Sequence, residues 1–583
     1  MASSTDTFRH PQLGSIQYAV TQGSLPLGRF FNLPYGRIPK RFARSELRTR
    51  LTDEESDEPY VATQAGPSSV QPRGSAKMDA KGLQLPTEQI KDDEGEWQSE
   101  TNCLQLSVSI PKTSIDRGPA AANEKLLPVL LFLHGGAFFL GSGDRSYYDP
   151  STLLAQAIES DRPMIYVSAN YRLGAHGFIH STAREGQAIP ENNGLADQVI
   201  LFRWIKENIA GFGGDPDNVT LMGQSAGAES VSLHNLVKSN AITKPYRRSI
   251  MLSGSPMCMP AKTKEEHEEN FRLKAKEMGM RIEGRSSEDL VKEIQDGGTE
   301  WEDKLRGLAL VGAPCSQSEI MPYETPSMAI LRGDTEAHNK SKVDGSKFGR
   351  WVEEQIVSSC GYDGGISYGM IKTNDKRKDN AKAFIGIIHA VLDRQGKAEQ
   401  AEELLKLYGI ESANMNDDEA LLAICQFESD VGFFSPTLAE AEGAGQGETT
   451  KTILQMFDLG NPFKGLLPVD QYATHTWDVV ALLGAFESRL QASQRDVIRD
   501  WRSKIIDFVH SGSQAAGLPE WQSHNGKALL INDKGCRAVN NTEIYGEATR
   551  VGQLRNIAKK VDEVWGEDIL WNDVCRRFLM KGE

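Results

Sequence analysis

The sequence predicts an α/β fold, with a central, mostly parallel β-sheet and helices on both of its faces. Short apolar runs of strand length recur along the chain, at 127–133, 164–168, 219–222, 249–252, 451–457 and 528–531. Several of these runs are separated by stretches with helical periodicity, such as 193–209. Because parallel strands need crossover connections and are buried on both faces, this alternation is typical of a parallel sheet covered by helices.

Three regions outside these strands differ in composition. Residues 52–98 are polar, acidic and rich in Ser, Pro and Gly, so we expect a partly mobile surface excursion there. Between 262 and 430 the chain is charged and loop-rich, with helical stretches at 264–278 and 379–408. The tail, 547–583, has apolar residues at helical spacing, which predicts packing on the same chain or a homodimer seam. We expect one domain over 1–583.

The bulk composition excludes some partners. The chain has 583 residues, 39% of them hydrophobic, which is enough to bury a large core. Its 65 basic residues against 80 acidic ones give a net charge of −15. Such a chain repels phosphate backbones and anionic membranes, so we expect neither nucleic acid nor membrane as a partner.

The segment 214–227, GDPDNVTLMGQSAG, predicts a catalytic serine. An apolar run ends at Met222, Gly223 and Gly227 flank Ser225 at two residues on either side, and a helix-like stretch follows. Strand, tight turn and helix in this order form a nucleophile elbow, which exposes the serine oxygen above a sheet edge. The amides at the start of the next helix then point at the negative charge that develops during acyl transfer.

Together with Phe212-Gly213-Gly214, this segment resembles the serine signature of the type B carboxylesterase and cholinesterase-like family. Two other segments are similar to the family's pattern: 33–42, LPYGRIPKRF, and 170–174, NYRLG. The resemblance implies an α/β-hydrolase fold with a small N-terminal sheet, and it implies that helical insertions within 262–430 wall the substrate cleft. For Arg172 it favours a structural role in an internal ion pair.

His134-Gly135-Gly136-Ala137-Phe138, directly after the run at 127–133, predicts an oxyanion hole. Backbone NH groups stabilise the oxyanion of acyl transfer, and glycine allows close approach of the backbone. By resemblance to HGGG-type esterases, the donors are Gly136, Ala137 and Ala226, and Gly135 shapes the turn. Ala137 replaces the usual third glycine, so its methyl group is expected to alter selectivity. Phe138 and Gln224 are candidate substrate contacts.

The general base is expected well downstream of the serine, on a loop after a late strand. His475 stands in such a loop, Ala473-Thr474-His475-Thr476-Trp477, just before an apolar helix pattern. This setting resembles the family's catalytic histidine segment. We therefore predict that His475 is the base.

The acid is predicted between serine and histidine. Asp363, in Gly361-Tyr362-Asp363-Gly364, corresponds to the family's carboxylate before glycine, where glutamate is more usual. A buried carboxylate of either kind fixes the histidine tautomer and stabilises the imidazolium. Glu354 is the reserve candidate. Ser253 resembles the serine that hydrogen-bonds the acid in relatives.

These residues predict a serine carboxylic-ester hydrolase that acts through an acyl-enzyme on a small to medium, mostly neutral ester or lactone. Acyl transfer from the same site is the alternative, and a non-catalytic cholinesterase-like binding protein is a minor one. Zinc-ligand spacings and phosphate-binding loops are absent from the sequence, so no metal or organic cofactor is implied.

The N-terminus shows no secretion signal, and no uncharged apolar run reaches 18 residues. Cys103 resembles the cysteine that secreted relatives pair with an earlier one, and no cysteine precedes it among the seven. A reducing compartment, the cytoplasm, is therefore the expected location.

Overall fold

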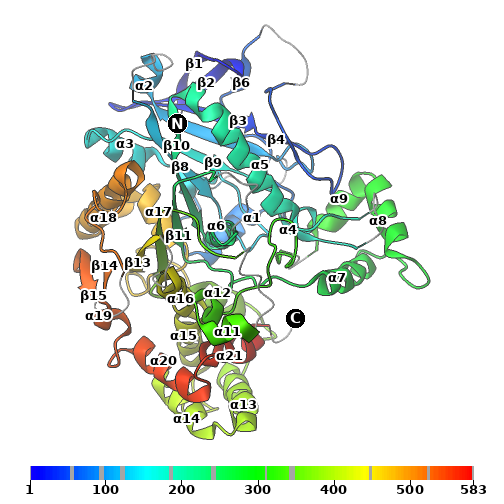
Figure 1. Ribbon diagram of the computed structural model, residues 1–583, viewed down its shortest axis with the longest axis vertical. Helices are drawn as coiled ribbons and strands as arrows, with labels where there is room; N and C mark the ends of the chain where they lie inside the picture. The colour runs from blue at the N-terminus through cyan, green and yellow to red at the C-terminus, as the bar shows by residue number, and fades with distance from the viewer. Residues whose placement is uncertain are drawn as a thin grey trace.

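The computed structural model describes residues 2–52, 58–88, 90, 97–117, 125–182, 188–237, 244–308, 312–340, 348–444, 450–521 and 526–580. Within these ranges one thirteen-stranded sheet runs through the molecule (Figure 1). Its central strands are parallel, in the order β9 (Ile165–Ala169), β8 (Leu127–Leu133), β10 (Gly214–Gln224), β11 (Arg248–Leu252), β12 (Glu354–Cys360), β13 (Lys451–Asp458) and β14 (Lys527–Asn532). The mostly parallel sheet predicted from the sequence is confirmed.

Antiparallel strands extend the sheet at both edges. One edge holds β1 (Ala2–His10), β2 (Gly14–Thr21), β3 (Leu27–Pro34) and β7 (Gln105–Pro111), with β6 (Tyr60–Ala62) paired to β2, and the other edge is β15 (Gly535–Asn540). The N-terminal strands are continuous with the main sheet because β3 pairs with β7. A separate two-stranded sheet follows them, formed by β4 (Gly36–Arg37) and β5 (Glu46–Leu47).

Helices cover both faces of the sheet, as the strand composition predicts. On one face lie α5 (Asn193–Asn208), α6 (Ala226–Asn235) and α16 (Ser435–Ala444), and on the other α3 (Ser151–Glu159), α17 (Trp477–Leu483) and α18 (Ala492–Ser511). Neighbouring residues of β8 alternate between the two cores: Leu131 packs with the first set and Phe132 with the second. Each strand therefore contributes apolar side chains to both layers.

The region expected to form a surface excursion contains a helix. Helix α1 (Ser75–Gly82) places Ala76 and Ala80 in the core beside Tyr147. Residues 53–57, 89 and 91–96 of this region lie outside the described residues. The small alanine side chains let α1 approach the core closely, which a composition average over 52–98 does not show.

The helical region after β11 forms two separate groups (Figure 1). Helices α7 (Lys264–Glu277), α8 (Ser287–Asp296) and α9 (Thr299–Arg306) form a small core together with Phe42, Ala175, Ile179 and Ile189. Helices α12 (Gly365–Lys372), α13 (Asn380–Leu392), α14 (Ala398–Leu407) and α15 (Asp417–Glu428) follow β12, and the C-terminal α20 (Arg550–Val561) packs against α14. The tail therefore packs on its own chain.

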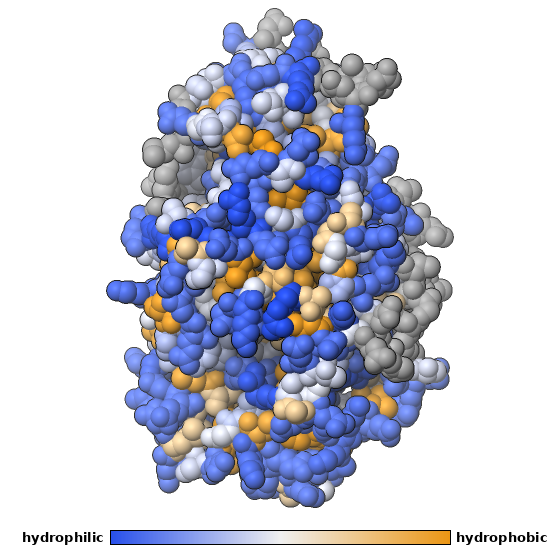
Figure 2. Space-filling view, turned by 90° about the vertical axis from the view of Figure 1, so that its left-hand side faces the viewer, coloured by the Kyte–Doolittle hydropathy of each residue, from blue (hydrophilic) through white to orange (hydrophobic). Residues whose placement is uncertain are grey.

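Shorter helices complete the fold: α2 (Lys112–Asp116), α4 (Gly174–Phe178), α10 (Met328–Leu331), α11 (Thr335–Lys340), α19 (Asn541–Tyr545), α21 (Gly566–Ile569) and α22 (Arg577–Leu579). Single turns lie at 146–148, 209–212, 393–395 and 487–489, and wider π-helical turns at Ser429–Phe434 and Leu570–Arg576. The face shown in Figure 2 is mainly hydrophilic, with apolar residues in small groups. Among the described helices, none combines the length and apolarity that crossing a bilayer requires.

Candidate active site

The predicted site residues lie where four parallel strands end. The loop 134–138 follows β8, Ser225 follows β10, Asp363 follows β12, and His475 lies in the connection between β13 and α17. The carboxyl ends of parallel strands meet at one edge of a sheet, and ligands of open α/β sheets bind outside that edge. His475 thereby contacts Asp363, 112 positions away in the sequence, and Gln224, 251 positions away.

Ser225 occupies the sharp turn that the sequence predicts. Its φ of 56° and ψ of −126° are unusual for a residue other than glycine, and α6 begins at the next residue. The surrounding backbone fixes this conformation, because the Ser225 NH donates to Leu252 O (2.9 Å) and the Glu229 NH donates to Ser225 O (2.9 Å). The serine is partly exposed between buried neighbours, as a nucleophile needs to be.

The two glycines that flank Ser225 are required by close backbone contacts. A Cβ atom on Gly223 would lie 2.2 Å from the carbonyl oxygen of Gly227, and one on Gly227 would lie 2.1 Å from that of Leu133. These distances are shorter than any real Cβ contact. The Gly-x-Ser-x-Gly spacing therefore lets α6 pack directly on the ends of β8 and β10.

The loop after β8 has the backbone shape of an anion site. Gly136, Ala137 and Phe138 have φ values of 110°, 52° and 56°. In the part of the chain that the structure describes, the NH groups of Gly136, Ala137 and Ala226 have no hydrogen-bond acceptor. Ala137 adopts a left-handed conformation that favours glycine, at a cost of about 1 kcal/mol.

The first and last residues of this loop, His134 and Phe138, are packed in the interior. His134 is buried, its ring stacks on Tyr171 (4.6 Å between centroids), and burial lowers its pKa to about 4. Phe138 is also fully buried and packs against Phe178 at 4.7 Å. Contact between Phe138 and a substrate stays a prediction.

His475 and Asp363 form a direct contact. The Nδ1 atom of His475 lies 2.7 Å from Oδ1 of Asp363, and both side chains are almost completely buried. The backbone NH of Cys360 donates to the other Asp363 oxygen at 2.8 Å. With Nδ1–H donated to the carboxylate, the neutral imidazole presents Nε2 as an acceptor, which is the tautomer that a general base requires.

The reserve acid, Glu354, lies at the opposite end of β12. It is the first residue of that strand, and its carboxylate accepts a hydrogen bond from the Ser513 backbone NH at 2.6 Å. The strand separates it from His475, so the geometry favours Asp363 as the acid.

Gln224, the residue before the nucleophile, contacts the other nitrogen of the base. Its Nε2 atom lies 3.2 Å from Nε2 of His475, and the side chain is 1% exposed. The sequence identified Gln224 only as a possible substrate contact. Its partner stands 251 positions away, so no local pattern reveals the pair.

Further carboxyl groups lie near Asp363, and no sequence pattern predicted them. Asp478, on α17, accepts a hydrogen bond from the Ser253 hydroxyl at 3.4 Å, and burial next to Asp363 raises its pKa to about 6. Glu428, on α15, accepts from Ser367 at 2.7 Å, and burial raises its pKa to about 8. The expectation that Ser253 bonds the acid is therefore wrong: its hydroxyl donates to Asp478 and accepts from the Cys360 NH (3.2 Å), and the NH of Cys360 is what bonds Asp363.

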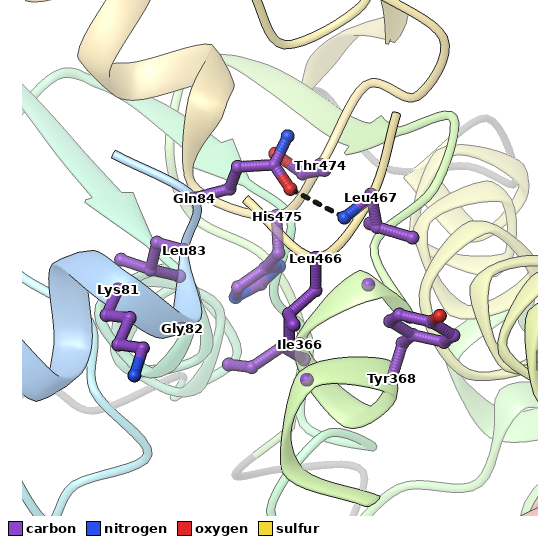
Figure 3. Close-up of a pocket in the computed structure, with 12 residues that line it drawn as sticks. Lys81, Gly82, Leu83, Gln84, Ile366, Tyr368, Leu466, Leu467, Thr474 and His475 are labelled. Atoms are coloured by element: carbon purple, nitrogen blue, oxygen red, sulfur yellow. Dashed lines mark hydrogen bonds between the residues drawn. The ribbon is translucent and has the colours of Figure 1, made fainter. Parts of the chain in front are cut away.

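A small pocket, with a cavity volume of about 10 Å³, lies against His475 (Figure 3). Helix α1 and the residues after it form one wall, and α12 and the segment at 466–467 form the others. Its aliphatic side chains are Leu83, Ile366, Leu466 and Leu467, and none of its twelve lining residues is acidic. Gln84 ties two walls together, because its side chain accepts from the Leu467 NH at 3.0 Å.

Arg172 forms the internal ion pair that the sequence predicts. Its guanidinium donates two hydrogen bonds of 2.8 Å to Asp197, and both side chains are at most 2% exposed. Ser45 donates to the same carboxylate at 2.6 Å. The structural role is confirmed.

Comparisons with known proteins match most of the chain. The model of the carboxylesterase family matches residues 13–545. A para-nitrobenzyl esterase of Bacillus subtilis is 32% identical over 330 residues, 55% of this chain and 60% of that protein, so the alignment spans about three fifths of the relative. Lipase 3 of Yarrowia lipolytica is 25% identical over 85% of this chain and 86% of that protein. A solved structure of a PNB esterase has a TM-score of 0.64 at 22% identity and covers 94% of this chain and 100% of its own, which confirms the fold.

Proposed function

Because the chain belongs to the carboxylesterase family, we propose that it is a serine hydrolase of carboxylic esters, with Ser225 as nucleophile, His475 as base and Asp363 as acid. One observation carries this assignment. The His475–Asp363 contact of 2.7 Å lies at the same sheet edge as a serine held in a left-handed turn at the start of a helix. Esterases and a lipase among the relatives support the reaction class.

The proposed reaction proceeds in two steps. Ser225 Oγ attacks the acyl carbon while His475 Nε2 takes its proton, and Asp363 stabilises the imidazolium. The oxyanion accepts hydrogen bonds from the NH groups of Gly136, Ala137 and Ala226. The C–O bond to the alcohol then breaks, the alcohol leaves with the proton, and water activated by His475 releases the acid.

The substrate is proposed to be a small to medium, mostly neutral ester or lactone. The pocket beside His475 is walled by aliphatic side chains and contains no carboxylate that would hold a cation. Gln224, next to the nucleophile, is neutral as well. The other side chains of the lining, Lys81, Gln84, Tyr368, Thr474 and His475, include no anion, so nothing in the pocket favours a cationic substrate group.

The test uses neutral esters of graded chain length and two serine variants. Ser225→Ala should lower kcat by about 10⁵ to 10⁶ without unfolding the protein, in line with serine-protease precedent. The matched control, Ser160→Ala on the exposed end of α3, should retain wild-type turnover. Retained turnover in Ser225→Ala would refute the mechanism. Product analysis with an added alcohol separates the two reactions, because hydrolysis yields the free acid and transfer yields a new ester.

A further inference from the structure

The free nitrogen of the proposed base is held by an amide. Nδ1 of His475 faces Asp363 at 2.7 Å, and Nε2 faces the Gln224 amide nitrogen at 3.2 Å. Within the described ranges the imidazole makes no other hydrogen bond. Because Nδ1–H is donated to the carboxylate, Nε2 accepts from the amide NH₂ group. The lone pair that must take the Ser225 proton is therefore engaged by Gln224, and this hydrogen bond has to break before His475 takes the proton.

Gln224 is fixed in this position from two sides. It is the last residue of β10, where the strand pairs with Leu252. A Cβ atom on Gly135 would lie 2.6 Å from the amide oxygen of Gln224, so the absence of a side chain at Gly135 leaves the space that the amide fills. The amide of Gln224 therefore packs between the oxyanion loop and the imidazole of His475.

In the described part of the chain, the titratable groups around His475 are four carboxyls, together with Lys81 and Tyr368, which line the same pocket. Asp363 contacts it, Asp478 on α17 and Asp79 on α1 interact with it electrostatically, and Glu428 lies near Asp363. The Phe433 ring packs 5.3 Å from the imidazole. Burial raises the pKa values of Asp478, Asp79 and Glu428, which shows that the surroundings accommodate negative charge poorly. An amide at position 224 adds no charge to this group.

We propose that Gln224 is a positioning residue that orients His475 through a hydrogen bond donated to Nε2 by a neutral amide. This inference rests on the proposed function. A hydrogen bond donated to the neutral imidazole stabilises that form, whereas a carboxylate at the same position stabilises the imidazolium. The enzyme should therefore stay active at a lower pH than a variant with glutamate at this position.

The pH dependence of kcat/KM tests the proposal. A nearby carboxylate shifts a titration by about 1 to 3 pH units, so Gln224→Glu should move the acid limb upward by that amount. Gln224→Met removes the donated hydrogen bond without adding charge, so its acid limb should move upward by less than about one unit and its plateau should fall. A merely structural residue would lower the plateau and leave the acid limb in place.

The chain offers a matched control in a second buried pair, in which Gln198 Oε1 lies 2.9 Å from His234 Nε2. Gln198→Glu should leave the acid limb unchanged, because His234 lies outside the site. An equal shift in this control, or an unmoved acid limb in both Gln224 variants, would overturn the proposal. Fluorophosphonate labelling of wild-type Ser225 is measured first, so that absence of labelling counts against the proposed function and not against the role of Gln224.

Discussion

The two ends of strand β12 carry the same type of residue in opposite settings. Glu354, at the amino end, is half-buried and accepts from one backbone NH of Ser513. Asp363, just beyond the carboxyl end, is fully buried, contacts His475 and accepts from the Cys360 NH. Since Glu354 opens strand β12 and Asp363 follows it, residue type alone does not separate them. The direction of the strand does, because the carboxyl edge of a parallel sheet is where loops converge.

The same contrast holds across neighbouring strands. At the amino edge, Arg247 and Glu353 pair at 2.6 Å with about half of each side chain exposed. Beyond the carboxyl end of β9, Arg172 pairs with Asp197 in full burial. Ion pairs and carboxylates at the carboxyl edge are therefore expected to have large effects when changed, and those at the amino edge small ones.

The largest expected effect is on turnover. Asp363→Asn should lower kcat by on the order of 10⁴ while the fold is preserved, because the imidazole then favours the wrong tautomer, as in the serine-protease precedent. Asp363→Glu should also impair the rate, because the extra methylene crowds a buried contact of 2.7 Å. Glu354→Gln should stay within a fewfold of wild type. Steady-state kinetics measures these rates. Near-wild-type turnover in Asp363→Asn together with a large loss in Glu354→Gln would contradict the comparison between the two strand ends.

The next effect is on stability. Arg172→Met should lower the free energy of unfolding by about 3 to 5 kcal/mol, because it leaves Asp197 buried without its cation. Arg247→Met at the amino edge should cost less than about 1 kcal/mol. Urea unfolding of both variants measures the difference. Equal losses would show that the two edges are not distinguished by burial.

Asp478 should make the free energy of unfolding depend on pH. Burial raises its pKa to about 6, compared with about 4 in an unfolded chain. A raised pKa means that the folded state binds the proton more tightly, so this contribution is fully present below pH 4 and is lost as the pH rises through 6. At about 1.4 kcal/mol per unit the loss is about 3 kcal/mol. Wild type should lose this much relative to Asp478→Asn between pH 4 and 7, and parallel urea profiles for the two proteins would contradict the assignment.

The smallest expected effect concerns substrate charge. Because Gln224 is neutral and the pocket beside His475 lacks acidic residues, a choline ester should show no preference over its carbon isostere. A cation gains about 1 kcal/mol or more from a nearby carboxylate, so the ratio of kcat/KM should stay below tenfold. A larger preference for choline would mean that an aromatic or anionic contact outside this pocket binds the cation.

Short sequence patterns predicted those parts of the site whose structure depends mainly on residues close in the sequence. The strand at 127–133 has the predicted bounds, and in the elbow around Ser225 the close contact between Gly223 and Gly227 joins near neighbours in the sequence. His475 and Asp363 were placed through resemblance, because their contact joins distant segments.

Other features were not predictable in this way. Strand β12, EQIVSSC, is mostly polar, so its central position depends on pairing with β11 and β13 on both sides. Gln224 and Asp478 obtain their roles from partners brought together only by the folded sheet. Helix α1 was not predicted, because its buried apolar residues are two alanines and not large side chains.

The central claim is that the carboxyl edge of the sheet holds one activated serine, and mapping a covalent adduct tests it most directly. Purified protein is treated with a fluorophosphonate, digested and examined by mass spectrometry. We predict a single stoichiometric adduct on Ser225, and little labelling in Asp363→Asn over the same time. An adduct on another serine, or wild-type protein that turns over esters without any adduct, would contradict the claim.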